Sequence, residues 1–151
     1  MKKLFLTLLL ILFAITIALG QEIKPYVYNN KNVHLIECNG IEGDGTIKKL
    51  YFIGLQIDSS INDSIIFKVC NKSVEYVDWQ LKYPLTYKFR KYIKEFDGTI
   101  VKRDNIIWVT IAGECRNTYN VPCAITTNIK FDLDGNIITE NGELSIRILD
   151  I

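Results

Sequence analysis

Residues 107–115 read IWVTIAGEC, and residues 123–131 read CAITTNIKF. In both stretches the odd-numbered positions are mostly apolar, and they carry Ile107, Val109, Ile111, Cys115, Cys123, Ile125, Ile129 and Phe131. Alternate residues of a strand share one face of a sheet, so each stretch predicts a strand with one apolar face. If the two strands form a hairpin, the two cysteines lie on the same face across its mouth.

The same pattern bears on how the cysteines pair. The chain has four of them, Cys38, Cys70, Cys115 and Cys123. An even number of cysteines in an exported chain predicts disulfides. Three connectivities are possible, and the hairpin favours Cys115–Cys123 together with Cys38–Cys70. We predict no metal site and no cofactor, because the chain has no Cys-x-x-Cys motif and only one histidine, His34.

The first twenty residues have the layout of a secretory signal peptide. Lys2 and Lys3 precede an apolar run from residue 4 to residue 19, and Ala18 and Gly20 are small residues before a cut at Gln21. The run is shorter than the roughly 20 residues that span a bilayer as a helix. We therefore predict cleavage, a secreted or periplasmic location and no stable membrane insertion afterwards, with residues 21–151 forming a single disulfide-stapled domain.

The charge balance excludes one class of partner. The chain has 18 basic and 17 acidic side chains, and removing Lys2 and Lys3 leaves 16 basic ones, for a net charge of −1. Nucleic-acid binding depends on clustered cations, so we predict that nucleic acid is not the partner.

Turn signals divide the rest of the chain into short strands. Asn-Gly and Asp-Gly pairs favour the hairpin turns that join antiparallel strands, and they occur at Asn39-Gly40, Asp44-Gly45, Asp97-Gly98, Asp134-Gly135 and Asn141-Gly142. We expect further strands at residues 33–38, 47–57, 65–70 and 74–81, and an antiparallel meander in the C-terminal half. Leu50 and Phe52 interrupt the alternation of residues 47–57, so we expect this strand to be covered on both faces. Residues 85–96 combine a helical stripe with strand-like alternation, and we favour a strand there.

Together these patterns predict an all-β protein. The expected architecture is a single antiparallel β-sandwich or flattened meander barrel of about eight to ten strands, with one short helix near 85–97 as the alternative for that segment.

Two stretches are candidates for a binding surface. Tyr83, Tyr87 and Arg90 lie in a segment that interleaves aromatic and basic residues. Arg116 and Tyr119 lie in the short segment between Cys115 and Cys123. A cross-linked loop with an exposed ring loses little entropy on binding.

No catalytic pattern stands out, since His34 has no evident nucleophile beside it and the carboxylates follow no recognisable spacing. We therefore predict a non-catalytic domain that binds an unidentified protein or glycan through its loops. A lipocalin-like carrier of a small apolar ligand is one alternative, and a hydrolase with a dispersed carboxylate site is another.

Overall fold

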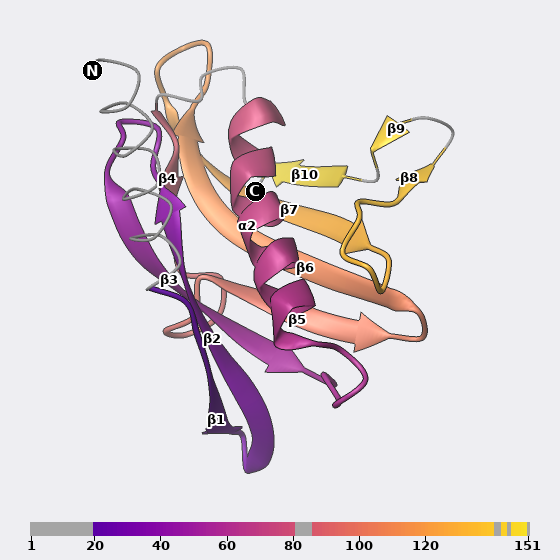
Figure 1. Ribbon diagram of the computed structural model, residues 1–151. Helices are drawn as coiled ribbons and strands as arrows, with labels where there is room; N and C mark the ends of the chain where they lie inside the picture. The colour runs from indigo at the N-terminus through magenta and orange to yellow at the C-terminus, as the bar shows by residue number, and fades with distance from the viewer. Residues whose placement is uncertain (1–19, 81–85, 141–142, 145, 151) are drawn as a thin grey trace, which may run out of the picture.

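The computed structural model describes residues 20–80, 86–140, 143–144 and 146–150. In this part of the chain ten strands and one helix occur, labelled as in Figure 1. Their bounds are β1 Glu22–Tyr28, β2 Lys31–Ile41, β3 Ile47–Leu55, α2 Asp63–Gln80, β4 Lys88–Phe89, β5 Gly98–Arg103, β6 Ile106–Arg116, β7 Pro122–Phe131, β8 Thr139–Glu140, β9 Glu143–Leu144 and β10 Ile146–Asp150.

Eight of the strands form one curled sheet in the order β1-β2-β3-β5-β6-β7-β10, with β4 paired to β6. Strands β8 and β9 form a separate two-stranded antiparallel sheet. The prediction of an all-β fold is confirmed, and the number of strands lies in the predicted range. The sheet is mixed, however, because β3 and β5 run parallel while the other neighbouring strands of this sheet are antiparallel. The prediction of a purely antiparallel sheet is therefore wrong at this pair.

The predicted strands at residues 65–70 and 74–81 are also wrong, because residues 63–80 form α2. Asn62 caps this helix, since its Oδ1 accepts a hydrogen bond from the backbone N–H of Ser64 at 2.9 Å. The buried side chains of Ile66, Val69 and Cys70 follow helical rather than alternating spacing. The helix lies in the connection from β3 to β5, and a parallel pair requires a crossover of this kind.

The segment that precedes β5 contains no α-helix within residues 86–97. It forms the two-residue strand β4 and then a tight turn in which Ile93 and Phe96 make an isolated bridge. The Asp97-Gly98 pair was predicted to be a hairpin turn, but Gly98 begins β5 instead. A Cβ atom on Gly98 would lie 2.3 Å from the carbonyl oxygen of Thr110, so this position is a close approach between strands. Asn39-Gly40 likewise lies inside β2.

Other predicted turns are confirmed. Gly45 lies between β2 and β3 with a φ of 87°, and Gly135 follows β7 with a φ of 73°. The predicted hairpin around residues 141–142 is consistent with the pairing of β8 and β9, although those two residues are outside the described ones. Two turns were missed: Asn29-Asn30 joins β1 to β2, and Asp104 begins the turn from β5 to β6, all three with positive φ.

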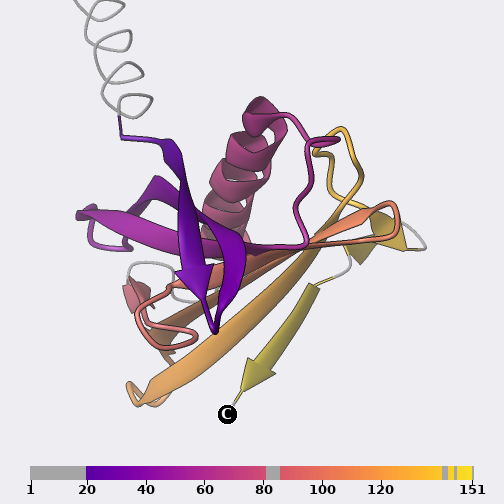
Figure 2. The same ribbon diagram turned by 90° about the horizontal axis from the view of Figure 1, so that it is seen from below.

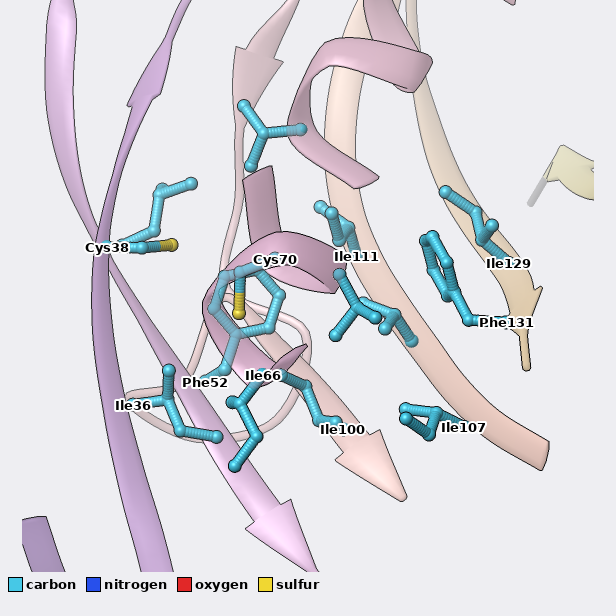
Figure 3. Close-up of a cluster of buried hydrophobic side chains, with 14 of the residues drawn as sticks. Ile36, Cys38, Phe52, Ile66, Cys70, Ile100, Ile107, Ile111, Ile129 and Phe131 are labelled. Atoms are coloured by element: carbon cyan, nitrogen blue, oxygen red, sulfur yellow. The ribbon is translucent and has the colours of Figure 1, made fainter. Parts of the chain in front are cut away.

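The main core lies between the concave face of the sheet and α2 (Figures 1 and 2). Its buried side chains come from the helix, from the six strands β2 to β7, and from Ile61 and Tyr87 in the connecting segments. Figure 3 shows Ile36, Cys38, Phe52, Ile66, Cys70, Ile100, Ile107, Ile111, Ile129 and Phe131 in this core. The meander β5-β6-β7-β10 forms one side of this sheet, so the predicted hairpin of residues 107–131 is confirmed as its centre.

A second, smaller cluster lies on the opposite face, which we call the outer face. Val33, Ile53 and Phe96 are buried there, and the partly buried side chains around them are Tyr26, Tyr28, Leu35, Tyr51 and Leu55. The turn of residues 91–97 covers this part of β1, β2 and β3. No helix in the described ranges is long and apolar enough to span a bilayer.

Candidate binding site

A pocket of about 360 Å³ opens on the outer face of the sheet. It is lined by Tyr26, Leu35, Tyr51, Lys91, Glu95 and Phe96. The first three come from neighbouring strands, and the last three come from the turn that follows β4. The pocket therefore has a sheet for its floor and one turn for its wall.

Aromatic rings shape this pocket. Phe96 is fully buried, and the rings of Tyr26 and Tyr28 meet it edge-on, with centroids 5.6 and 5.7 Å away. Edge-to-face packing of this kind adds to the stabilisation from burial. Phe96 thus holds the two tyrosine rings of β1 in place, and it does so from the turn.

Polar groups stand beside the rings. The hydroxyl of Tyr26 donates a hydrogen bond to Oε1 of Glu95 at 3.0 Å. This bond, with burial and the carboxylate charge adding to it, raises the pKa of Tyr26 above its ordinary value, so the phenol remains protonated at neutral pH. Nζ of Lys91 lies 5.6 Å from the centre of the Tyr51 ring. One carboxylate, one ammonium group and one hydroxyl therefore belong to the same pocket.

Asp97 fastens the wall of the pocket to its floor. Its side chain is fully buried, and its Oδ2 accepts hydrogen bonds from the backbone N–H of Tyr51 at 3.0 Å and from Nζ of Lys91 at 2.8 Å. Its own backbone N–H donates to the carbonyl of Tyr51 at 2.8 Å. Oδ1 of Asp97 is buried without a hydrogen-bond partner, so this carboxylate carries a desolvation cost as well as an anchoring role.

The predicted binding surface around residues 83–90 is corrected in part. Tyr87 is 1% exposed and packs edge-on against Phe89 in the main core, with ring centroids 5.1 Å apart, so it is not a surface residue. Arg90 is exposed and forms an ion pair with Glu114. Tyr83 lies outside the described residues.

The segment between β6 and β7, residues 117–121, forms a well-organised loop. Oδ1 of Asn117 accepts hydrogen bonds from the backbone N–H groups of Tyr119 and Val121 at 2.9 and 3.0 Å. Nη1 of Arg116 donates to the carbonyl of Asn120 at 2.7 Å. Tyr119 is 85% exposed, as a contact residue requires, whereas the guanidinium of Arg116 serves the loop itself. This loop contributes no residue to the pocket lining.

The structure places the predicted cysteine partners in proximity but shows no disulfide between them. Cys115 and Cys123 are directly opposed in the β6–β7 ladder. Cys38 on β2 and Cys70 on α2 are both fully buried, and their thiols interact with each other. All four residues carry thiols in the structure, so the disulfides themselves remain a prediction.

His34 lies half-buried in β2, with its Cβ near Gly54 of β3. Among the described residues no group of three or more His, Cys, Asp or Glu side chains is placed to hold a metal ion. In the turn after β7, the Asp132 carboxylate instead accepts hydrogen bonds from the backbone N–H groups of Asp134 and Asn136, at 3.0 and 2.8 Å.

Sequence patterns gave no direct sign of the pocket. Its residues come from three strands, at positions 26, 35 and 51, and from the turn at positions 91, 95 and 96, so they are separated along the chain. Lys91 did lie in the stretch that interleaves rings and cations, but its partners on the strands were not identified. The interruption of the alternation by Leu50 and Phe52 indicated only that β3 is covered on both faces, and this expectation is confirmed by the clusters on the two faces. Comparisons of the chain with family models, with curated proteins and with solved structures find no match.

Proposed function

We propose that this protein is a non-catalytic binding domain that takes up a sugar ring of a glycan in the pocket on its outer face. The observation that carries the proposal is the composition of that pocket, in which tyrosine rings on rigid strands stand beside a carboxylate and an ammonium group. Its volume of about 360 Å³ falls in the range of small-molecule sites, roughly 300–1,000 Å³.

The chemistry of a sugar matches these groups. One side of a pyranose ring presents C–H groups, which pack well against an aromatic face, and its edge presents hydroxyls. Tyr51 supplies a half-buried ring for the apolar side. Glu95 can accept hydrogen bonds from sugar hydroxyls, and Lys91 can donate them.

The charges of the pocket disfavour an anionic ligand. The ammonium group of Lys91 is paired with Asp97, and the carboxylate of Glu95 is engaged by the Tyr26 hydroxyl. An anionic ligand would have to displace Asp97 from Lys91 and would be repelled by the Glu95 carboxylate. A neutral sugar adds hydrogen bonds to these groups without displacing either pair.

A small apolar ligand is the second candidate for the same pocket, because Leu35 and Phe96 contribute apolar surface to its lining. This candidate corresponds to a carrier function. Mass spectrometry of the purified protein under native conditions distinguishes it, since a carrier of this kind co-purifies with lipid or another apolar molecule.

The test is a screen of the protein on an array of immobilised glycans, followed by calorimetric titration with the soluble form of any glycan that binds. Tyr51→Ala should weaken binding by about two- to tenfold, since losing an aromatic contact costs about 0.5–1.5 kcal/mol and about 1.4 kcal/mol is a factor of ten. Lack of binding to every glycan would contradict the proposal, and so would unchanged binding by this variant.

The matched control is Tyr92→Ala, which removes the same type of ring from the turn that forms the wall of the pocket. Tyr92 is 42% exposed and does not line the pocket, so this variant should bind as the unmodified protein does. Tyr119→Ala tests the other predicted surface. If the glycan is lost in Tyr119→Ala and kept in Tyr51→Ala, the binding site is the β6–β7 loop and not the pocket.

A further inference from the structure

We propose that the four cysteines form two disulfides of unequal accessibility. The Cys38–Cys70 bond joins α2 to the sheet and is inaccessible to reagents in the folded protein. The Cys115–Cys123 bond lies at the base of the 117–121 loop, and in the folded protein reductants open it and thiol oxidants close it. One bond lies in the main core and the other at one loop, and none of the four cysteines lines the pocket.

The first pair lies in the middle of the main core. Cys38 belongs to β2 and Cys70 to α2, both are fully buried, and Figure 3 shows both side chains facing the same apolar cluster. Burial, and in second place the contact with Cys38, raises the pKa of the Cys70 thiol well above its ordinary value. The neutral thiol is a poor nucleophile, so once the protein has folded this pair exchanges only when the core opens.

The second pair lies at the end of the central hairpin. Cys115 and Cys123 face each other in register across β6 and β7, and directly opposed residues of antiparallel strands have Cα atoms about 4.5–5.5 Å apart. This separation falls in the range that disulfides span, about 4.4–6.8 Å. Both side chains are partly exposed, so a reagent in solution can reach them.

The bond would close the base of the 117–121 loop. The Cys123 thiol already lies 3.6 Å from the carbonyl oxygen of Val121, and Arg116, next to Cys115, holds the carbonyl of Asn120. Opening or closing the cross-link therefore acts on the two ends of the loop that presents Tyr119.

The chemistry is thiol–disulfide exchange with a disulfide-bearing oxidant such as oxidised glutathione. The thiolate of Cys115 or Cys123 attacks the oxidant, forming a mixed disulfide and releasing one thiol of the oxidant. The other cysteine of the pair then attacks the mixed disulfide as a thiolate, forming the Cys115–Cys123 bond and releasing the second thiol. The pair loses two protons and two electrons, and the oxidant gains them as two thiols.

The test begins with refolding of the reduced protein in a glutathione redox buffer. Intact mass after alkylation in denaturant should show no alkylated cysteine and no retained glutathione, and peptide mapping should find the two proposed bonds. Detection of a cross-link between the pairs, such as Cys38–Cys115, would contradict the proposal, and so would four alkylatable thiols after oxidation.

The inequality of the bonds is tested on the oxidised, folded protein. A phosphine reductant followed by alkylation without denaturant should label Cys115 and Cys123 at least about tenfold faster than Cys38 and Cys70, because labelling of the buried pair requires local unfolding. With denaturant present, all four should be labelled. Equal rates for both pairs in the folded protein would overturn the proposal.

Two double variants separate folding from redox chemistry. Cys115→Ser with Cys123→Ser should leave one disulfide that resists reductant in the folded protein. The double variant Cys38→Ala with Cys70→Ala removes the buried pair. It should retain the Cys115–Cys123 disulfide, which reductants should open readily in the folded protein. If the second variant fails to fold, the first still decides the matter, because rapid opening of its single bond would contradict the sealed position of Cys38–Cys70.

Discussion

The two faces of the sheet carry different kinds of side chain, although they share the same strands. The concave face is apolar and covered by α2, whereas the outer face carries tyrosines, lysines and carboxylates around a small apolar cluster. Strand β3 shows the difference most clearly. Leu50 and Phe52 are fully buried in the main core, while Tyr51 between them is half-buried and lines the pocket. Alternation along one strand thus separates the residues that hold the fold from those available to a ligand.

The side chains of the outer face also change from apolar to ionic along its length. Next to the pocket, at the opposite end from the Phe96 cluster, Glu37 on β2 is flanked by lysines from both neighbouring strands. Its carboxylate lies 3.0 Å from Nζ of Lys24 and 2.9 Å from Nζ of Lys49. The pocket is therefore lined largely by members of the apolar cluster and adjoins an ionic one.

The largest expected effect on the free energy of unfolding comes from truncating a buried side chain on the concave face. Phe52→Ala should lower the free energy of unfolding by about 4 kcal/mol, because a fully buried ring leaves a cavity that packed neighbours on β2 and α2 cannot fill. Urea unfolding followed by circular dichroism measures the change. Loss of less than about 2 kcal/mol would mean that the core is less tightly packed than the structure shows.

The same substitution on the outer face sharpens the comparison. Phe96→Ala should cost less, about 2 kcal/mol, because its cluster contains mostly half-buried side chains that can move into the space. It should also release Tyr26 and Tyr28 from their edge-on contacts. If both substitutions destabilise the protein equally, the proposed division between a structural face and a binding face is wrong.

Asp97→Ala should have an intermediate effect on stability and a large one on the pocket. The change leaves the backbone N–H of Tyr51 without its side-chain acceptor and removes the ion pair of Lys91, and we expect a cost of about 3 kcal/mol. The turn of residues 91–96 should then detach from β3. Hydrogen exchange of the amides in this turn measures the detachment, and unchanged protection would show that Asp97 does not hold the wall.

The strand patterns predicted much of the fold because they depend on local alternation. The hairpin of residues 107–131 and the two-sided covering of β3 were predicted from the spacing of apolar residues alone. The helix was missed because the stretch 65–81 is rich in β-branched and aromatic residues, which favour strands. Asn62 as a cap and helical spacing at Ile66, Val69 and Cys70 were the available signals.

The pocket could not be predicted in the same way, because it depends on contacts between distant segments. Tyr26, Tyr51 and Phe96 come together only through the ladders of β1, β2 and β3 and the anchoring of the turn by Asp97. Tyr87 illustrates the opposite error. Its position among basic residues suggested exposure, yet its ring fills the space over Gly113, where a Cβ atom would lie 2.2 Å from it.

The smallest expected effect comes from the ionic end of the outer face. Hydrogen bonds from Lys49 and then Lys24 lower the pKa of Glu37 below its ordinary value, so the folded state binds a proton to this carboxylate less readily than the unfolded state does. The stabilisation is therefore fully present above the ordinary pKa of about 4.5 and is lost as the pH falls through the lowered value. Glu37→Gln should cost less than about 1 kcal/mol at pH 7 and a smaller amount at pH 2. Urea midpoints at the two pH values measure this difference, and an equal cost at both would show that Glu37 stabilises the strands by packing and not by charge.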